Sequence, residues 1–203
     1  MNKGVLLIVS GPSGAGKGTI CSEYMKRRPE TFLSVSATSR NPRPGDEDGV
    51  TYFFKTREEF ERMIEAEELL EHAEFCGNYY GTPKAPAFSA MDEGRDVILE
   101  IEVQGALQVK EKYPEAVLVF VLPPSPEILR SRLEGRGTET TEAVNKRIGE
   151  AEREISQSPK YDYIIINDDL SEATGLLESI SDSEKAKVAS SKDYLKNIWN
   201  LKE

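Results

Sequence analysis

Short apolar runs alternate with longer amphipathic segments along most of the chain. The apolar runs are rich in β-branched residues and apolar on both faces, as strands buried between two layers of helices must be. They lie at residues 5–10, 96–101, 116–122 and 163–167. The segments with helical spacing lie at 17–28, 57–67, 103–112, 126–134, 141–157 and 170–201. This alternation predicts an α/β fold in which helices wrap a parallel sheet.

Two segments interrupt the alternation. From Ser34 to Thr82 the chain has more turns and short alternating runs, SVSATSR, TYFF and LLEHAEF, which favour a small antiparallel insert at the edge of the sheet. From Gly135 to Thr141, glycines separate what would otherwise be two consecutive helices. Connecting segments of this kind are typical of mobile, functional parts, so we expect both to move.

Composition and charge narrow the class of protein. The chain has 203 residues, 38% of them hydrophobic and 31% charged, which predicts one globular domain. A net charge of −10 argues against a nucleic-acid-binding protein and against an anionic membrane surface as a partner. The first apolar run, Val5 to Val9, is too short for a signal peptide, so we expect a cytoplasmic protein. We also expect free thiols at Cys21 and Cys76, and His72 alone does not indicate a zinc site.

The stretch GPSGAGKGT follows the first predicted strand and opens the first predicted helix. It reads G-x-x-x-x-G-K, the phosphate-binding P-loop, in which backbone N–H groups surround a phosphate at the positive end of a helix. A glycine-rich turn without a ligand is the alternative, disfavoured because strand, motif and helix follow in order. The predicted ATP-binding residues of this loop are Gly11, Pro12, Ser13, Gly14, Ala15, Gly16, Lys17, Gly18 and Thr19.

Lys17 is the predicted charge on the terminal phosphates of ATP, and Mg²⁺ would need a hydroxyl close by. The usual Ser or Thr position holds Gly18, and Thr19 comes one residue later. Thr19 is therefore the candidate direct magnesium ligand, and this departure leaves the ligand open.

The segment SRNPRPGDEDG places two arginines three residues apart, Arg40 and Arg43. The interleaved prolines favour polyproline II, which has about three residues per turn, so both guanidinium groups could clamp one phosphate. A solvated basic loop is an equal alternative. Tyr52, Tyr79 and Tyr80 fit either core rings with local hydroxyl partners or donors to a phosphate.

Three glutamates are candidates for ligand contact. Alternation in LLEHAEF puts Glu71 on the same face as apolar neighbours, and a buried carboxylate needs donors. In VILEIEVQG, Glu100 and Glu102 are predicted to share one face near a strand end, where α/β sheets bind ligands. One could serve Mg²⁺ through water and the other a ligand, while exposed surface positions are the alternative.

Taken together, the chain resembles the guanylate kinases over almost its whole length. The matching segments are SGPSGAGKGT (10–19), SVSATSRNPRPGDEDGVTYFF (34–54), EHAEFCGNYYGTP (71–83), LEIEVQGA (99–106), RLEGRGTET (132–140), NKRIGEAE (145–152) and IINDDL (165–170). The resemblance implies transfer of the γ-phosphoryl of Mg-ATP to GMP, and we expect dGMP to serve as an acceptor as well. It also implies a P-loop NTPase fold: a parallel sheet wrapped by helices, with a mixed or antiparallel nucleotide-binding insert and a helical lid. The implied parts are a core at 1–36, 84–134 and 158–203, an insert at 37–83 and a lid at 135–157.

The resemblance also implies roles for individual residues. Those that would bind GMP are Ser36, Glu71, Thr82 and Glu102 at the guanine, and Arg40, Arg43, Tyr52 and Tyr80 at the phosphate, with Asp46 beside them. Those that would bind ATP outside the P-loop are Arg132, Arg136 and Arg147 at the phosphates and Asn167 near the adenine. The charges implied in catalysis are those of Lys17, Arg40, Arg136 and Arg147, and Glu100 would reach Mg²⁺ through water. Some relatives have aspartates where Glu100 and Glu102 stand, which leaves their division between base and metal open.

Two other functions fit part of the pattern. Some guanylate-kinase-like domains only bind proteins, but these have a degraded P-loop, and here Gly16, Lys17 and Thr19 are intact. A kinase with another phosphorylated acceptor would not need a carboxylate such as Glu71. Near the C-terminus, the stripe Tyr194, Leu195, Ile198 and Trp199 fits either core packing or the subunit contact of a homo-oligomer.

Overall fold

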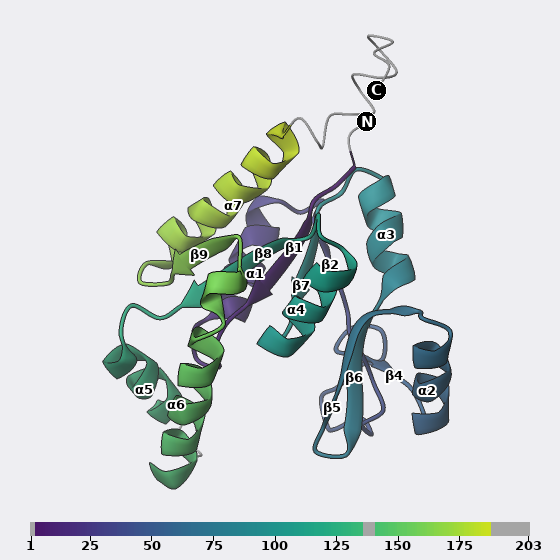
Figure 1. Cartoon of the computed structure of the whole chain (residues 1–203), viewed down its shortest axis with the longest axis horizontal. Helices are drawn as coiled ribbons and strands as arrows, with labels where there is room; N and C mark the ends of the chain where they lie inside the picture. The colour runs from purple at the N-terminus through teal and green to yellow at the C-terminus, as the bar shows by residue number, and fades with distance from the viewer. Residues whose placement is uncertain (1–2, 136–140, 188–203) are drawn as a thin grey trace.

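The computed structural model describes residues 3–135 and 141–187, and its centre is a five-stranded parallel sheet (Figure 1). The sheet has the strand order β2-β7-β1-β8-β9, in which each neighbouring pair is parallel. Its strands are β1 (Leu6–Ser10), β2 (Phe32–Leu33), β7 (Val97–Glu100), β8 (Val117–Leu122) and β9 (Tyr163–Ile166). Because β1 lies in the middle, the loop that follows it opens at the centre of the carboxyl edge.

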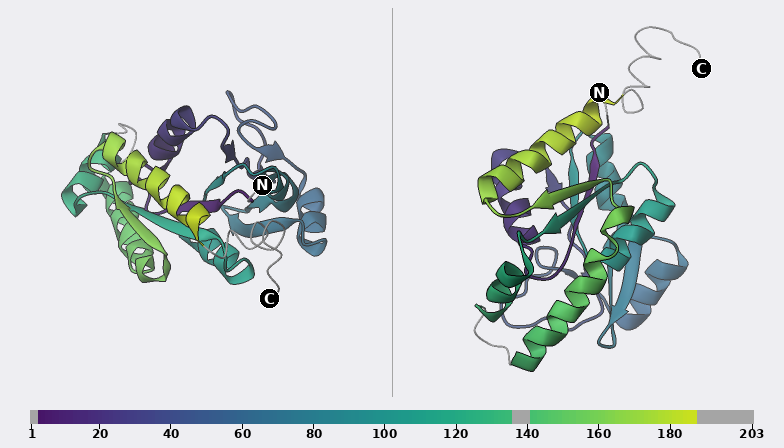
Figure 2. Two further views of the ribbon diagram at one scale, coloured as in Figure 1. Left: turned by 90° about the horizontal axis from the view of Figure 1, so that it is seen from above. Right: turned by 60° about the vertical axis from the view of Figure 1, so that its left-hand side comes forward.

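Helices cover both faces of this sheet (Figure 2). They are α1 (Lys17–Arg27) and α7 (Leu170–Ala186) on one face, and α3 (Lys84–Asp92) and α4 (Val103–Lys112) on the other. Alternate residues of β1 supply the two cores: Leu7 and Val9 pack with α1 and α7, and Leu6 and Ile8 pack with α3 and α4. All four side chains are almost completely buried, which explains why the run is apolar on both faces.

The insert forms a second sheet of four strands with the order β4-β3-β6-β5. Its elements are β3 (Ala37–Thr38), β4 (Phe53–Phe54), α2 (Arg57–Glu65), β5 (Leu69–Phe75) and β6 (Asn78–Pro83). Pairs β3–β6 and β5–β6 are antiparallel and β3–β4 is parallel, so the sheet is mixed, which is one of the two forms predicted for the insert. The small core beneath this sheet contains Ala37, Phe60 and Leu69.

Two helices form a separate lobe beside the carboxyl edge of the sheet, α5 (Pro126–Glu134) and α6 (Thr141–Ile155). Leu129 and Leu133 of α5 pack against Val144 and Ala151 of α6. The break between them at Gly135 confirms the predicted interruption. A short 3-10 turn at Ser158–Lys160 then leads to β9.

The prediction of one helix over 170–201 is wrong, because α7 ends at Ala186 and Lys187 has the extended ψ of 141°. The stripe from Tyr194 to Trp199 and residue Arg136 lie outside the described residues. The thiols of Cys21 and Cys76 are free, as predicted. Among the described residues, no helix has the length and hydropathy needed to cross a membrane.

Candidate nucleotide-binding site

The loop between β1 and α1 has the backbone shape that a phosphate site requires. Gly11, Gly14 and Gly16 have φ values of 141°, 91° and 91°, in the region that residues with a side chain rarely adopt. A Cβ atom at Gly11 would lie 2.2 Å from the carbonyl oxygen of Val121 in the neighbouring strand. The loop is therefore fixed both by conformation and by the close approach of β8.

Side chains from two later segments hold the same loop from outside. The amide nitrogen of Asn167 donates to the carbonyl of Ala15 at 2.8 Å, and Arg132 donates to that carbonyl at 3.4 Å. Arg132 also donates to the carbonyl of Asn167 at 2.9 Å, which ties the two together. A Cβ atom at Gly16 would lie 2.3 Å from the Asn167 amide, so only glycine leaves room for this contact. The predicted ATP residues Asn167 and Arg132 thus lie directly against the P-loop.

Two cations lie at the mouth of the loop. The ammonium of Lys17 donates to the carbonyls of Gly11 and Pro12, at 2.6 and 3.3 Å. Arg147 of α6 donates to the hydroxyl of Ser13. The α5–α6 lobe therefore contacts the P-loop through the very arginine that the sequence assigned to the phosphates of ATP.

The carboxylates beside Lys17 are arranged differently from the prediction. Strand β7 ends at Glu100, and Glu102 is the N-cap residue of α4 with a ψ of 159°, so the hypothesis that they share one strand face is wrong. A Cβ atom at Gly18 would lie 3.3 Å from a carboxylate oxygen of Glu100, which places this carboxylate beside the missing hydroxyl position. Burial raises the pKa of Glu100, the charge of Lys17 opposes the rise, and that of Glu102 adds to it.

A third carboxylate, that of Glu154 on α6, belongs to the same electrostatic group. Burial is the main cause that raises its pKa to about 7, the charge of Glu102 adds to the rise, and Lys17 opposes it. The sequence analysis missed Glu154, because the helical pattern of α6 does not show which of its polar residues lies near Glu102 and Lys17 of the core.

The residues present fit a magnesium ion that arrives with a nucleotide. Among the described residues, no group of three or more His, Cys, Asp or Glu side chains could hold a metal ion alone. Mg²⁺ commonly binds through one or two carboxylates together with water and substrate phosphates. Glu100 supplies such a carboxylate next to the P-loop, whereas Thr19 is exposed in the first turn of α1.

At the base of the insert, Glu71 of β5 is buried, with an exposed fraction of 6%. The buried hydroxyl of Thr82 in β6 donates to one of its oxygens at 2.7 Å. The other oxygen lies against α4, where a Cβ atom at Gly105 would come within 2.7 Å of it. Burial raises the pKa of Glu71 and the Thr82 hydrogen bond opposes the rise. The pair confirms that this carboxylate is buried with a donor, and Gly105 is a neighbour that the sequence analysis missed.

Half-buried Ser36 lies immediately before β3, which pairs with β6, the strand that contains Thr82. Its carbonyl accepts a hydrogen bond from the backbone of Phe53 at 2.9 Å, which fixes the approach to the strand.

The predicted phosphate clamp of the insert is centred on Arg40. Its guanidinium forms an ion pair with Asp46 at 2.9 Å and lies 5.4 Å from the ring centre of Tyr52. Tyr52 and Tyr80 make an edge-to-face contact with ring centres 6.0 Å apart. Asp46 also accepts from the backbone N–H of Arg43 at 2.8 Å, and these two contacts lower its pKa, the backbone one more strongly. The carboxylate therefore holds both arginine positions together, while the Arg43 side chain is exposed.

Tyr79 has contacts that decide between the two roles considered for it, a core ring with local hydroxyl partners or a phosphate donor. Its ring stacks on Phe60 with centres 5.3 Å apart, and its hydroxyl contacts Arg57 and Glu61. It is therefore a packing residue of the insert whose hydroxyl has local partners.

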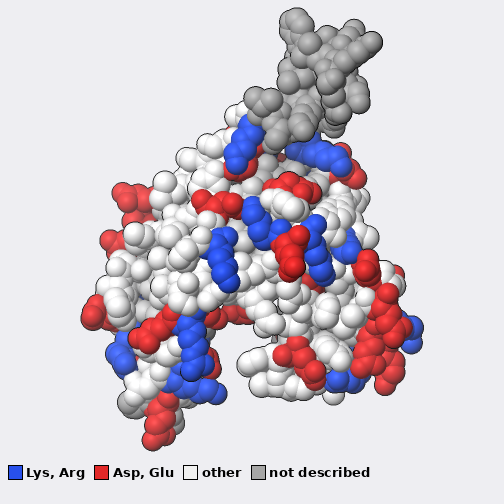
Figure 3. Space-filling model, viewed as in Figure 1, with Lys and Arg blue, Asp and Glu red and all other residues white. Residues whose placement is uncertain are grey.

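The P-loop and Glu71 are connected by a short path through the start of α4. Gly18 lies beside Glu100, Glu102 caps α4, and Gly105 of the same helix touches Glu71. The space-filling view shows a notch between the α5–α6 lobe and the insert (Figure 3). This arrangement places an anion-binding loop and a carboxylate that can accept two hydrogen bonds on one side of the molecule.

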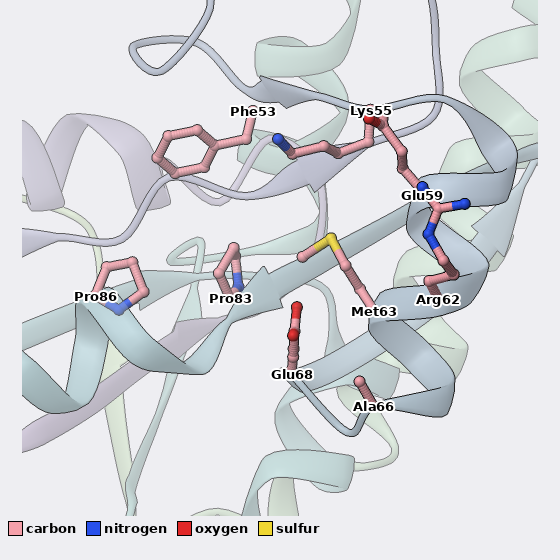
Figure 4. Close-up of a pocket in the computed structure, with 9 residues that line it drawn as sticks. All are labelled: Phe53, Lys55, Glu59, Arg62, Met63, Ala66, Glu68, Pro83 and Pro86. Carbon is pink, nitrogen blue, oxygen red and sulfur yellow. The ribbon is translucent and has the colours of Figure 1, made fainter.

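A separate pocket of about 590 Å³ lies between α2, β4 and the start of α3 (Figure 4). Its walls combine apolar and charged residues, namely Phe53, Lys55, Glu59, Arg62, Met63, Ala66, Glu68, Pro83 and Pro86. None of the predicted site residues lines it, so it is distinct from the notch.

Comparisons with known proteins agree with this geometry. A family model described as guanylate kinase matches residues 3–184. A guanylate kinase of Carboxydothermus hydrogenoformans is 55% identical over 187 residues, covering 92% of this chain and 92% of the relative. One of Desulfitobacterium hafniense is 52% identical over 187 residues, covering 92% and 94%. The crystal structure of guanylate kinase from Anaplasma phagocytophilum matches with a TM-score of 0.76 at 31% identity, covering 100% of this chain and 98% of the other.

Proposed function

The chain belongs to the guanylate kinase family and is an ATP:GMP phosphotransferase, and we propose how its residues divide this work. The observation that carries the proposal is the buried Glu71–Thr82 pair, joined to the P-loop through α4. A P-loop alone indicates a nucleoside triphosphate. The buried carboxylate adds a specific acceptor site and so identifies the base.

On the ATP side, the backbone N–H groups of residues 11–16 bind the phosphates, and Lys17 moves from its loop carbonyls to the terminal phosphate. Arg132 and Asn167 hold the Ala15 carbonyl and thereby fix the loop. When bound with ATP, Mg²⁺ supplies positive charge that shields the β- and γ-phosphates. Glu100 would hold it through water, with Thr19 as the alternative direct ligand.

On the GMP side, guanine presents donors at N1 and N2 next to an acceptor at O6. Glu71 accepts from both donors, the hydroxyl of Ser36 donates to O6, and the hydroxyl of Thr82 turns from Glu71 to O6 when the base binds. Glu102, the N-cap residue of α4, takes part in the same recognition, and Gly105 of that helix leaves room for the Glu71 carboxylate. Adenine would face Glu71 with a bare acceptor at N1, and a buried carboxylate left without donors is costly.

The phosphate of GMP binds to Arg40, Arg43, Tyr52 and Tyr80, and Asp46 positions the first two. Because the acceptor is itself an anion, its approach to ATP requires positive charge between the two phosphates. Arg40 and Arg147 supply that charge from opposite sides of the notch, together with Lys17, and Arg136 is assigned the same role from the sequence. Transfer is then direct, with no covalent intermediate on the protein.

Three parts carry out these steps: the core, the insert at 37–83 and the lid at 135–157. We infer that both outer parts close over the two nucleotides, because closure excludes water as a competing acceptor. We also propose that this activity serves purine nucleotide metabolism in the cytoplasm, with GMP and dGMP as acceptors, a proposal that the match to the guanylate kinase family supports.

The test is a coupled assay with ATP and a panel of GMP, dGMP, IMP and AMP. We expect GMP to be preferred over AMP by roughly 10⁴-fold in kcat/KM, because the site leaves a buried charge unpaired with adenine. IMP lacks the N2 amino group and falls between them. Equal use of AMP and GMP would contradict the assignment of the guanine pocket.

The matched variant is Glu71→Gln, which keeps the shape of the side chain and removes its charge. We expect kcat/KM for GMP to fall roughly 10²-fold or more, because an amide cannot accept two hydrogen bonds as an anion. Unchanged GMP efficiency in this variant would refute the role of Glu71 and leave the P-loop assignment intact.

A further inference from the structure

A second pocket, of about 440 Å³, lies where the insert meets the core. It is lined by Ile64, Glu67, Leu69 and His72 of the insert and by Lys84, Lys112 and Tyr113 of the core. Its volume lies within the roughly 300–1,000 Å³ that small-molecule sites occupy. None of these residues has a role in the nucleotide site described above, although His72 follows Glu71 directly in β5.

Basic groups dominate the charge of this pocket. Lys84 and Lys112 contribute two ammonium groups and His72 a third basic group, against the single carboxylate of Glu67. Within the part of the chain that the structure describes, neither lysine takes part in an ion pair. Although the chain has a net charge of −10, these two cations give the pocket a local positive potential that favours binding of an anion.

The position of Lys84 adds an independent argument. It is the first residue of α3, a helix whose first turn contains no acidic residue. A helix N-terminus favours negative charge, so a lysine there is unfavourable unless an anion lies close by. A bound anion would therefore satisfy both the ammonium group and the end of the helix.

Lys112 acts from the other side of the pocket. Burial is the main cause that lowers the pKa of His72, and the charge of Lys112 lowers it further. The same ammonium group opposes the rise in the pKa of Glu71. Its field therefore reaches both neighbouring residues of β5. The apolar walls, Leu69 and Ile64, strengthen such fields because they exclude water.

We propose that this pocket is a second ligand site, which binds the phosphate group of a small molecule between Lys84, Lys112 and His72. Lysine binds phosphate as a point charge, and protonated imidazole donates from its ring nitrogens. Ile64, Leu69 and Tyr113 leave an apolar surface for the remainder of such a molecule. The site lies at the junction of the insert and the core. The proposal of this site does not depend on the preference for guanine proposed above.

The chain offers a direct probe, because His72 is its only histidine. The Cε1 proton of His72 is followed by NMR while sodium phosphate is added, with sodium chloride at equal ionic strength as the reference. We expect a saturable shift with phosphate alone and an increase in the pKa of His72, since binding and protonation are linked. The other titratable groups of the pocket are Glu67, Lys84, Lys112 and Tyr113. Absence of a saturable shift would overturn the proposal.

Variants identify the site that causes the shift. Lys84→Gln and Lys112→Gln should each weaken phosphate binding about two- to fivefold, the size of one exposed charge interaction. Glu67→Gln should strengthen binding, because it removes a negative charge from the pocket. Lys26→Gln, on the exposed face of α1, is the control and should change nothing.

Phosphate also has access to the P-loop, so the titration is repeated with saturating ADP to occupy that loop and, separately, in Lys17→Ala. A shift of His72 that persists there supports a separate site. A shift that disappears with Lys17, or that is unaffected by both pocket lysines, overturns the proposal.

Discussion

Around the P-loop, most polar contacts run from a side chain to a backbone carbonyl, whereas two central contacts of the insert join two side chains. Lys17, Arg132 and Asn167 all donate to carbonyls of residues 11–15. In the insert, Glu71 pairs with Thr82, and Arg40 pairs with Asp46. The first site is thus shaped by the chain itself and the second by a few matched side chains.

This difference follows from what each site recognises. A triphosphate needs many equivalent donors, which backbone N–H groups at a helix start provide whatever the side chains are. A base needs donors and acceptors at particular places, which only side chains can supply. We therefore expect single substitutions to affect the rate on the ATP side and affinity or specificity on the GMP side.

The largest effect is expected for Lys17→Ala. We expect kcat to fall roughly 10³-fold, because the lysine charge stabilises the transferred phosphoryl group. KM for ATP should change only a few-fold, since the backbone N–H groups remain. Steady-state kinetics with varied ATP measures both constants, and circular dichroism checks that the variant is folded.

The control for Lys17→Ala is Lys26→Ala on the same helix, which should retain full activity. A rise in KM as large as the fall in kcat would show that the lysine, and not the loop backbone, carries ATP binding. That result would remove the contrast between the two sites.

Asp46→Asn tests the paired side chains of the insert. We expect KM for GMP to rise about tenfold, because Arg40 and the Arg43 backbone lose a charged acceptor. KM for ATP should not change. An opposing effect exists, since the substitution also removes negative charge near the phosphate of GMP. A lower KM for GMP would therefore show that Asp46 weakens binding and does not position Arg40.

Stability offers a further contrast, because the buried charge of Glu71 serves the ligand and not the fold. Burial raises its pKa above the unfolded value. The folded protein therefore binds the Glu71 proton more tightly than the unfolded chain does. The resulting contribution to stability is complete below the unfolded pKa and is lost as the pH rises through the folded pKa. At pH 7 we expect Glu71→Gln to be more stable than the parent by about 1 kcal/mol, in exchange for lost activity.

Urea unfolding without nucleotides measures this difference at pH 7 and at pH 4, with Glu142→Gln as an exposed control. The advantage of Glu71→Gln should disappear at the lower pH, where the parent is protonated. An equal advantage at both values would mean that packing, and not charge, separates the two proteins.

The sequence predicted the core strands well because hydrophobic burial determines them locally. The runs at 5–10, 116–122 and 163–167 differ from β1, β8 and β9 by one residue at one end. Helix α3 was missed, since KAPAFSAMD has a proline and small buried alanines in place of an amphipathic pattern. Strand β2 has two residues, too few to give a pattern.

Errors and details that the sequence left open concentrated where tertiary contacts decide the outcome. The parallel pairing of β3 with β4 depends on two residues of each strand, which no local rule specifies. Glu102 was placed in a strand because three residues cannot distinguish a period of 2 from the approach to a helix. Buried Glu71 was found from alternation, but its contacts with Thr82 and Gly105 come from segments distant in sequence.

The smallest effect is expected for Glu154 of α6, whose charge acts on Lys17 of the P-loop. Because its pKa is raised to about 7, it passes from mostly neutral at pH 6 to mostly ionised at pH 8. The ionised form places a negative charge in the field of Lys17, where it opposes the triphosphate. ATP binding by the parent should therefore weaken as the pH rises, beyond the change due to ATP itself.

Glu154→Gln removes this titration while keeping the length of the side chain. We expect the ratio of KM for ATP at pH 8 to that at pH 6 to be about two- to threefold smaller in this variant, the size of one partly screened charge. KM for GMP is measured in the same way, because Glu102, which is proposed to bind guanine, belongs to the same electrostatic group as Glu154. Glu142→Gln, an exposed carboxylate of the same helix, should behave as the parent does. Equal ratios in all three proteins would show that α6 leaves the P-loop electrostatically undisturbed. The ATP side would then depend on its backbone and Lys17 alone, which would sharpen its contrast with the insert.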